Sequence, residues 1–290
     1  MNKPIIAIMY DFDKTLCTRD MQEYTFIPSI GMEPHEFWAH TYDVAMEETM
    51  DNILTYMYCM VEKSHQTGNP LTRESLVACG KDIEYHPGVE GWFERINRYA
   101  AEAGVEVEHY VLSSGLKEII EGTSIAKYFK KIYACEFLYK DGQAYWPKMA
   151  VNYTNKTQFV YRINKGVLDV SDDKTLNDSM PDDSKRVPFT NMIYLGDGLS
   201  DVPCMKMMRS YGGQAIAVYQ ESNRMGVEDL LGKGRVDFMF KADYSEGTAL
   251  DLTIKNIIRK MAICDLLGEE NARQLRSIGG DVLPGQEGLF

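Results

Sequence analysis

Short apolar runs alternate with amphipathic stretches along most of the chain. The first run, Ile5–Tyr10, is continuous and rich in β-branched residues, which is typical of a strand buried on both faces. Later runs of the same kind predict strands at residues 105–112, 132–137, 192–195, 215–218 and 238–240. The amphipathic stretches predict helices at residues 89–103, 155–164 and 248–267, and another from residue 116 onward. Because strands alternate with helices, we expect an α/β fold built on a Rossmann-like, doubly wound parallel sheet.

Residues 18–86 have a different pattern of apolar and polar residues. They contain no strand-like run, and aromatic residues, methionines and glutamates recur there at helical spacing. The apolar stripe from Met46 to Met60 is typical of an amphipathic helix that faces a core. We therefore expect a mainly helical domain at residues 18–86, inserted into an α/β core domain formed by residues 1–17 and 87–290.

Two further segments interrupt the alternating pattern. The dipeptide Asp141-Gly142 lies within residues 139–146 and predicts a β-hairpin with a tight turn. Residues 169–183 are polar and acidic without periodicity, so we expect a mobile loop there.

Composition narrows the class of protein. Of the 290 residues, 44% are apolar and 26% are charged, a balance that allows a sizeable buried core. The formal net charge of -12 argues against nucleic-acid or anionic-membrane partners, which attract basic surfaces. Six scattered cysteines without a CxxC pair indicate reduced thiols. With no predicted signal peptide or membrane-spanning run, we expect a cytoplasmic protein, and the sequence indicates no particular oligomeric state.

Three polar clusters follow predicted strands at their carboxyl ends. In an open parallel sheet these strand ends share one edge, and ligands bind there. Residues that are distant in the sequence should therefore converge at that edge. The clusters are Asp11-Phe12-Asp13, Ser113-Ser114-Gly115 and the stretch from Gly196 to Asp201.

Asp11 and Asp13 are the first candidates for chemistry. Two carboxylates this close repel each other unless a cation lies between them or one is protonated. A hard divalent cation such as Mg²⁺ suits their oxygen atoms. One carboxylate can act as a nucleophile in aspartyl-phosphate chemistry while the other acts as general acid and base. The alternative is a turn in which one Asp caps the backbone and the other is solvated.

The other two clusters offer groups for a phosphate and a metal. The Ser113 hydroxyl and the two amides that follow it are predicted to precede a helix, whose N-terminus favours an anion. Asp197 can complete a metal site with Asp11, and Asp201 lies one helical turn further on. Taken singly, each cluster is also explained by a helix cap or a glycine-rich turn.

Together the clusters resemble the motifs of the haloacid dehalogenase superfamily. Residues 11–15, Asp-Phe-Asp-Lys-Thr, resemble its DxDxT signature, and Ser113 after an apolar strand resembles its second motif. Residues 196–201, Gly-Asp-Gly-Leu-Ser-Asp, resemble its GDxxxD motif. Their order and separation are similar to the phosphoserine-phosphatase-like branch, and residues 18–86 stand where that branch has a helical C1-type cap.

This resemblance implies a Mg²⁺-dependent phosphomonoester hydrolase that acts on a small phosphorylated metabolite through an aspartyl-phosphate. It implies that Asp11 is the nucleophile and Asp13 the general acid and base. The implied metal ligands are Asp11, the backbone carbonyl of Asp13, and Asp197, supported by Gly198 and Asp201. The residues implied to hold or orient the phosphoryl group are Thr15, Ser113, Ser114 and Lys156.

The lysine of that set has a rival in the sequence. The family has a phosphate-binding lysine between its second and fourth motifs, and Lys156 and Lys165 both stand in that interval. Lys156 opens a predicted helix, as the family's third motif does. Lys165 precedes Gly166 at the end of the same helix, where a cation commonly complements the helix dipole. We therefore expect Lys156 to be the phosphate ligand.

Other outcomes of the same chemistry stay open at this point. A phosphotransferase would pass the phosphoryl group to another alcohol, and an inactive protein on this scaffold would only bind a ligand. A carbon–halogen hydrolase is disfavoured, because such enzymes need no metal and usually lack the second Asp of DxDxT. All matched positions here are chemically competent, which favours an active phosphatase.

Overall fold

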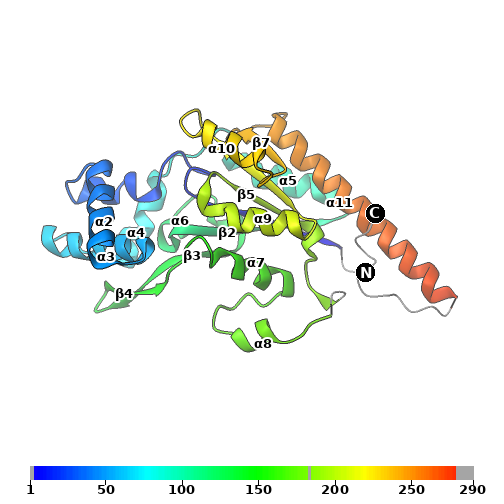
Figure 1. Cartoon of the computed structure of the whole chain (residues 1–290), viewed down its shortest axis with the longest axis horizontal. Coiled ribbons are helices and arrows are strands. Elements are labelled where there is room, and N and C mark those ends of the chain that lie inside the picture. The colour runs from blue at the N-terminus through cyan, green and yellow to red at the C-terminus, as the bar shows by residue number, and fades with distance from the viewer. Residues whose placement is uncertain (1–2, 182–183, 279–290) are drawn as a thin grey trace.

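Seven strands form one sheet in the order β4-β3-β2-β1-β5-β6-β7 (Figure 1). The structure is a computed structural model, and it describes residues 3–181 and 184–278. Neighbouring strands run parallel except β3 and β4, which form the predicted hairpin. The prediction of a Rossmann-like parallel sheet is confirmed. The strands are β1 (Ile5–Tyr10), β2 (Glu106–Leu116), β3 (Phe129–Lys140), β4 (Gln143–Met149), β5 (Met192–Gly196), β6 (Gln214–Tyr219) and β7 (Phe238–Lys241).

Helices cover both faces of this sheet (Figure 1). The core helices are α5 (Val89–Glu102), α6 (Lys117–Glu121), α7 (Lys156–Lys165), α8 (Asp173–Asn177), α9 (Val202–Ser210), α10 (Arg224–Gly232) and α11 (Ala249–Ser277), with 3-10 turns η3 (Ala126–Tyr128), η5 (Phe189–Asn191) and η6 (Leu199–Asp201). Helices α5 and α11 pack together, and so do α7 and α9. Helix α11 continues beyond residue 267, its predicted end. The predicted alternation of strands and helices therefore produces a layered α/β core.

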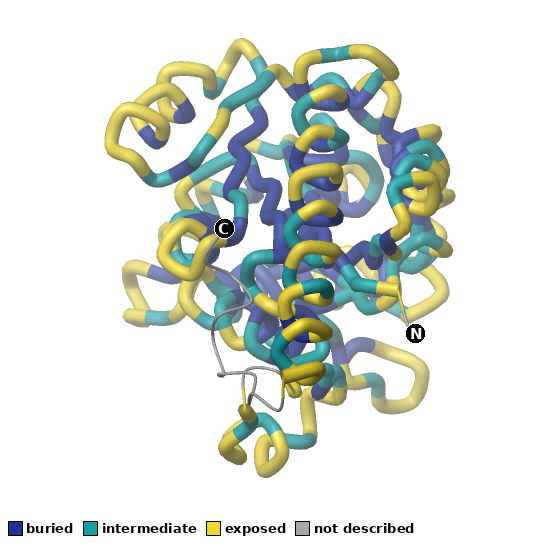
Figure 2. The backbone as a smooth tube through the Cα atoms, turned by 90° about the vertical axis from the view of Figure 1, so that its right-hand side faces the viewer, coloured by how far each residue is buried: buried dark blue, intermediate teal, exposed yellow. Residues whose placement is uncertain are grey.

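The direction in which the sheet grows reverses between β1 and β5. The chain first adds β2, β3 and β4 on one side of β1 and then adds β5, β6 and β7 on the other. Nearly all of β1 is buried, and Figure 2 shows buried backbone gathered in the interior of the molecule. The amide of Asp11 continues the ladder by donating to the carbonyl of Leu195 at 2.9 Å. Asp11 thus leaves β1 beside the end of β5, at the point where ligands of such sheets bind.

Residues 18–86 form a helical group at one end of the sheet (Figure 1). Its elements are η1 (Met21–Glu23), α1 (Phe26–Ser29), α2 (Pro34–Glu48), α3 (Asn52–Thr67), α4 (Arg73–Cys79) and η2 (Gly80–Asp82). The two passages of chain that join this group to the sheet lie side by side, because Cys17 forms a bridge with Tyr85. The predicted domain boundaries, after residues 17 and 86, lie beside this bridge. The division into two domains stays a prediction.

The second polar cluster forms the end of β2, where the sequence predicts residues that follow the strand. Strand β2 continues through Leu116, so Ser113 and its two successors belong to an irregular strand end. The following helix, α6, begins only at Lys117. Pairing of Leu116 with Cys135 of β3 extends the strand past the irregularity. The expectation that these amides precede a helix is confirmed, since Leu116 is the N-cap residue of α6, and the strand is longer than predicted.

The acidic segment 169–183 also differs from its prediction. It contains the short helix α8, and the buried Arg162 side chain donates to two of its backbone carbonyls at 2.6 and 3.1 Å. Arg162 also donates to the Asp173 carboxylate at 2.6 Å. The sequence does not predict this short helix or these hydrogen bonds, and the mobility of the segment stays a prediction. The described part of the segment excludes residues 182–183.

Two absences hold for residues 3–181 and 184–278. No helix in this part of the chain is long and apolar enough to cross a bilayer. This part includes all six cysteines, and no disulfide joins any of them. Five of the six are buried, as expected for thiols that behave as small apolar side chains.

Backbone atoms of the helical group and of the core lie in direct contact where α4 approaches α6. A Cβ atom on Gly122 would overlap the backbone carbonyl of Val77, and one on Gly80 would overlap the carbonyl of Ile119. Both glycines have φ values that any residue adopts, -79° and -63°. Their lack of a side chain is therefore needed for close approach and not for backbone conformation.

We expect Gly122→Ala to lower the free energy of unfolding by about 1–3 kcal/mol, because the added methyl group overpacks this contact. The matched control is Gly226→Ala in α10, where a Cβ would meet no atom within 4 Å. That change should stabilise the protein by about 0.5–1 kcal/mol through higher helix propensity. Urea denaturation compares the three proteins, and equal stability of the two variants would contradict the close contact.

Candidate active site

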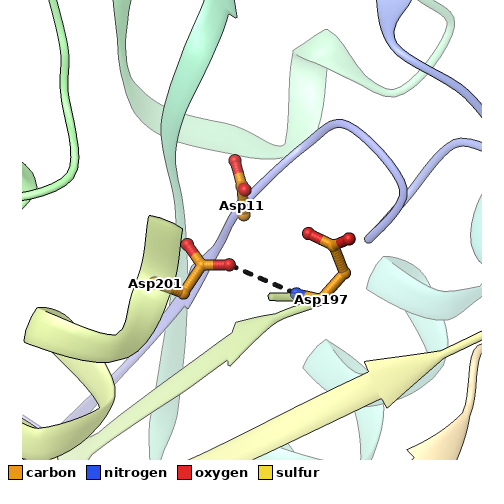
Figure 3. A group of neighbouring side chains, drawn as sticks. All are labelled: Asp11, Asp197 and Asp201. Atoms are coloured by element: carbon orange, nitrogen blue, oxygen red, sulfur yellow. Dashed lines mark hydrogen bonds between the residues drawn. The ribbon is translucent and has the colours of Figure 1, made fainter. Parts of the chain in front are cut away.

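Three carboxylates meet at the point where the sheet reverses (Figure 3). Asp11 follows β1, Asp197 follows β5, and Asp201 is the N-cap residue of α9. One carboxylate oxygen of each lies within 4.8 Å of the others. Asp11 and Asp197 point to the same side of the strand ends, whereas Asp201 accepts a hydrogen bond from the Asp197 amide at 3.2 Å (Figure 3). The structure thus brings together residues of the first and third predicted clusters.

Lys156 supplies the buried positive charge of this group. It is the first residue of α7, and its side chain is 0% exposed. Its ammonium Nζ lies 3.1 Å from Asp11 Oδ2 and donates to Asp201 Oδ1 at 2.9 Å. The Tyr194 hydroxyl donates to the same Asp201 oxygen at 2.7 Å. Lys165 instead donates to two backbone carbonyls at the end of α8, at 2.6 and 2.8 Å, so geometry places only Lys156 beside Asp11.

The signature turn directs Asp13 towards the helical group. Its Oδ1 accepts a hydrogen bond from the backbone amide of Met21 at 2.8 Å. Between the two acids and Thr15, Lys14 adopts a left-handed backbone conformation with φ of 57° and binds Asp20 at 2.6 Å. The orientation of Asp13 therefore depends on the first turn of the helical group.

The three hydroxyl groups that are predicted to hold or orient the phosphoryl group differ in their hydrogen bonding. Ser113 Oγ is buried and accepts a hydrogen bond from the Gly115 amide at 2.9 Å. Thr15 Oγ1 and Ser114 Oγ are buried and have no hydrogen-bond partner among the described residues. A buried hydroxyl without a partner destabilises the protein. The Ser114 hydroxyl is therefore available to the oxygen atoms of a ligand, because Ser114 lines the cavity described below.

Burial and crowding shift the protonation of the acids. The pKa of Asp11 is raised to about 7 by burial and by Asp201, against the opposing effect of Lys156. Burial, Asp201 and Asp11 raise the pKa of Asp197 to about 8. Burial and neighbouring carboxylates also raise the pKa of Asp13 well above its usual range. Burial alone would lower the pKa of Lys156, but Asp11 and Asp201 raise it, so its ammonium stays charged.

This donor set fits a hard divalent cation. The acids offer oxygen atoms only, and a cation between Asp11 and Asp197 would relieve the repulsion that raises their pKa values. Both oxygens of Asp201 already accept hydrogen bonds, one from Lys156 and one from the Asp197 amide. The arrangement therefore favours Asp11 and Asp197 as direct ligands and Asp201 as a residue that positions them.

A cavity of about 530 Å³ opens next to these acids. Asp11, Asp13, Asp197 and Gly198 line its core side, and residues of η1, α2 and α3 line the opposite side. A second cavity of about 750 Å³ is lined by residues of the stretches 80–91 and 122–124. Only the smaller cavity reaches the cluster of acids, so we take it as the candidate site.

Two side chains that orient the acids were not predicted from the sequence. Tyr194 binds Asp201, and the Asn223 amide group donates to the Asp197 carbonyl and carboxylate at 3.3 and 3.4 Å. A tyrosine in the buried strand β5 is itself a signal, because a buried hydroxyl needs a partner. Asn223 lies in a loop after β6, and no local pattern distinguishes it.

Comparisons with known proteins agree with this geometry. A family model for haloacid dehalogenase-like hydrolases matches residues 8–206. An uncharacterized protein of Borreliella burgdorferi is 27% identical over 280 residues, which cover 85% of this chain and 94% of that protein.

Solved structures share the fold at low sequence identity. A HAD family hydrolase from Salmonella enterica subsp. enterica serovar Typhi has a TM-score of 0.57 at 16% identity, over 88% of this chain and 72% of that one. A phosphoserine phosphatase, described as a phospho-aspartyl intermediate analogue, has a TM-score of 0.52 at 16% identity, over 82% of this chain and 94% of that one. At this identity the likeness shows a common fold.

The raised pKa values predict how stability depends on pH without a metal. Asp197 has a folded pKa of about 8 and an unfolded one of about 3.9. Between those values the folded state holds a proton that the unfolded state has lost, so stability falls as pH rises. In EDTA, we expect the thermal midpoint of the wild-type protein to be lower at pH 8 than at pH 5, because this range lies between about 3.9 and about 8, the two pKa values.

Asp197→Asn removes this acid and should flatten that fall, so that the variant exceeds the wild type most at pH 8. Added Mg²⁺ should raise the wild-type midpoint more than that of the variant, because a cation needs the carboxylate. Asp229→Asn, at an exposed position of α10, serves as the matched control. Identical pH profiles for Asp197→Asn and wild type would contradict the repulsion argued here.

Proposed function

The chain belongs to the haloacid dehalogenase-like hydrolase family, and on this premise we propose that it is a Mg²⁺-dependent phosphatase of a small phosphorylated metabolite. The observation that carries the proposal is the buried pair of Lys156 and Asp11, 3.1 Å apart beside a cavity. Phosphoryl transfer depends mainly on positioning and on charge stabilisation. This pair supports both, because it joins a carboxylate to a cation at one place.

Asp11 is the nucleophile in this proposal. Its Oδ1 accepts a hydrogen bond from the Phe12 amide at 2.8 Å, and Oδ2 faces Lys156, so the carboxylate is oriented before substrate binds. A carboxylate oxygen bonds to phosphorus while the bond from phosphorus to the leaving alcohol oxygen breaks. Water then attacks the phosphorus and frees Asp11. The phosphoserine phosphatase of similar fold, described as a phospho-aspartyl intermediate analogue, supports this sequence of steps.

Asp13 transfers the protons. Its raised pKa favours a protonated carboxyl group, which donates its proton to the leaving alcohol oxygen. The resulting carboxylate accepts a proton from the attacking water in the second step. The hydrogen bond from the Met21 amide holds this side chain at the cavity, which supports the role.

Four side chains hold the transferring phosphoryl group in this proposal. Lys156 supplies the positive charge, and the buried hydroxyls of Thr15 and Ser114 supply donors that lack another partner. Ser113 Oγ accepts from the Gly115 amide, which leaves its own hydroxyl hydrogen to donate to a phosphoryl oxygen. Donors fixed in this way need little reorganisation as charge moves onto the phosphoryl oxygens.

Mg²⁺ would be held by Asp11, Asp197 and the backbone carbonyl of Asp13, where it would supply positive charge that offsets the acids and attracts phosphoryl oxygens. Asp201 supports this site, since it binds both Lys156 and the Asp197 amide. Gly198 lines the cavity next to Asp197, and a Cβ atom added to it would meet no atom within 4 Å. Its lack of a side chain leaves room beside the cation.

Asp11→Asn should lower Mg²⁺-dependent hydrolysis of p-nitrophenyl phosphate by at least about 10⁴-fold, the scale on which loss of a covalent nucleophile lowers kcat in other hydrolases. The reason is that an amide cannot form the acyl phosphate. Release of inorganic phosphate measures the loss. Quenched-flow labelling with ³²P-substrate should detect a protein-bound phosphoryl group in the wild type and none in the variant.

Asp229→Asn is again the matched control and should keep wild-type turnover. Folding of Asp11→Asn is checked by circular dichroism and by its thermal midpoint in EDTA, which should not fall below that of the wild type, because one of the repelling carboxylates is gone. Unchanged turnover in a folded Asp11→Asn protein would reject this mechanism.

A further inference from the structure

Helix α11 carries an exposed apolar cluster near its middle. Ile263, Leu266 and Leu267 are 50%, 62% and 56% exposed. Their spacing of three and four residues places them on one face of the helix, and the buried residues Ile258 and Met261 belong to the opposite face. The last turns of α11 extend beyond the other helices at the edge of the molecule (Figure 1). Aliphatic side chains gathered in solvent in this way indicate a surface that another molecule covers.

Charged residues of opposite sign flank this cluster. Arg259 and Lys260 precede it and are exposed, and Glu269 and Glu270 follow it. Arg259 and Glu270 lie on the same face as Ile263, because they are four residues before it and seven residues after it. Along α11 this face is therefore basic, then apolar, then acidic. A face of that kind is complementary to a copy of itself that runs in the opposite direction.

From this pattern we infer that α11 pairs with α11 of a second copy of the chain, in antiparallel orientation. In a pair centred between residues 264 and 265, Ile263 of each copy meets Leu266 of the other, and Arg259 meets Glu270. A two-fold axis at the centre makes each contact occur twice. A parallel pair in register would place Arg259 on Arg259 and Glu270 on Glu270, where like charges repel. The order of charges thus selects the antiparallel dimer.

The other charges of the helix allow this pairing. It places Lys260 opposite Glu269, and Arg273 opposite the neutral Asn256. Glu270 accepts a hydrogen bond from Arg273 of its own helix at 2.7 Å. An exposed ion pair of this kind contributes little to stability, so it does not prevent Glu270 from binding the second copy.

The core leaves this face of α11 open. The opposite side of α11 packs on α5 and β7, so a second copy binds without displacing either element. None of the residues of the proposed contact, all of which belong to the described part of the chain, lines the cavity at the acids. The dimer and the proposed phosphatase function can therefore fail independently.

Sedimentation velocity of the full-length protein at increasing concentration tests this contact. A contact between single helices lies at the small end of protein interfaces, so we expect a reversible dimer with a micromolar Kd. Leu266→Gln should raise Kd by about 100-fold, because both copies lose a buried leucine. The matched control is Leu231→Gln in α10, at a leucine that is 39% exposed and lies outside this face. It should keep the wild-type Kd.

Charge reversal tests the orientation of the two helices. Arg259→Glu and Glu270→Arg should each raise Kd by about tenfold, because two attractive pairs become repulsive. The double variant restores opposite charges across an antiparallel contact, so its Kd should return to within about threefold of the wild-type value. Arg224→Glu, at an exposed position of α10, is the matched control and should leave Kd unchanged.

The outcomes distinguish the surface from its orientation. A wild-type protein that sediments as a single chain at every concentration overturns the dimer and leaves the face to a different partner. A dimer that survives Leu266→Gln overturns the choice of surface. Single reversals that weaken the dimer, without recovery in the double variant, overturn the antiparallel orientation. Recovery in the double variant also shows that the single variants lose a contact and not their fold.

Discussion

One buried ammonium group allows the acids at the strand ends to lie close together. Lys156 lies between Asp11 and Asp201, within 3.1 Å of both. Without a cation there, three buried carboxylates would repel one another strongly. A single positive charge does not balance them, and burial together with the remaining repulsion raises the pKa values of Asp11 and Asp197. The site is therefore assembled with a deficit of positive charge, which is the condition under which a divalent cation binds well.

The same constraint couples the acids to the helical group. Asp13 is oriented by the amide of Met21, and the Met21 sulfur accepts a hydrogen bond from the Leu116 amide at 3.0 Å. A Cβ on Gly115 would overlap the Met21 side chain, so the irregular end of β2 and the first turn of the group fit together closely. Movement of that turn would therefore change the position of the proposed general acid. Access to the cavity and readiness for proton transfer depend on the same contact.

Different parts of this site were predictable to different degrees. Asp11 and Asp197 could be placed together because parallel strands share their carboxyl ends, a consequence of topology that short apolar runs reveal. The helix that follows the Ser113 cluster was predictable, whereas the extension of β2 through the cluster was not, because it depends on pairing with β3. Gln22 was not predictable at all. Its position in the cavity lining depends on how the 3-10 turn η1 packs against the core. No sequence pattern distinguishes a neutral polar residue at such a place.

An overall charge of -12 is unfavourable for the binding of an anionic substrate. The structure resolves this through a separation of charge inside one cavity. Lys156 and the proposed metal make the deep end positive, while Asp20 and the aromatic rings of Trp38 and Tyr56 surround the other end. The net charge of the chain therefore does not describe the surroundings of the proposed phosphoryl position. Net charge then opposes binding only weakly, because the nearby ammonium of Lys156 acts at a shorter distance than the dispersed surface charges.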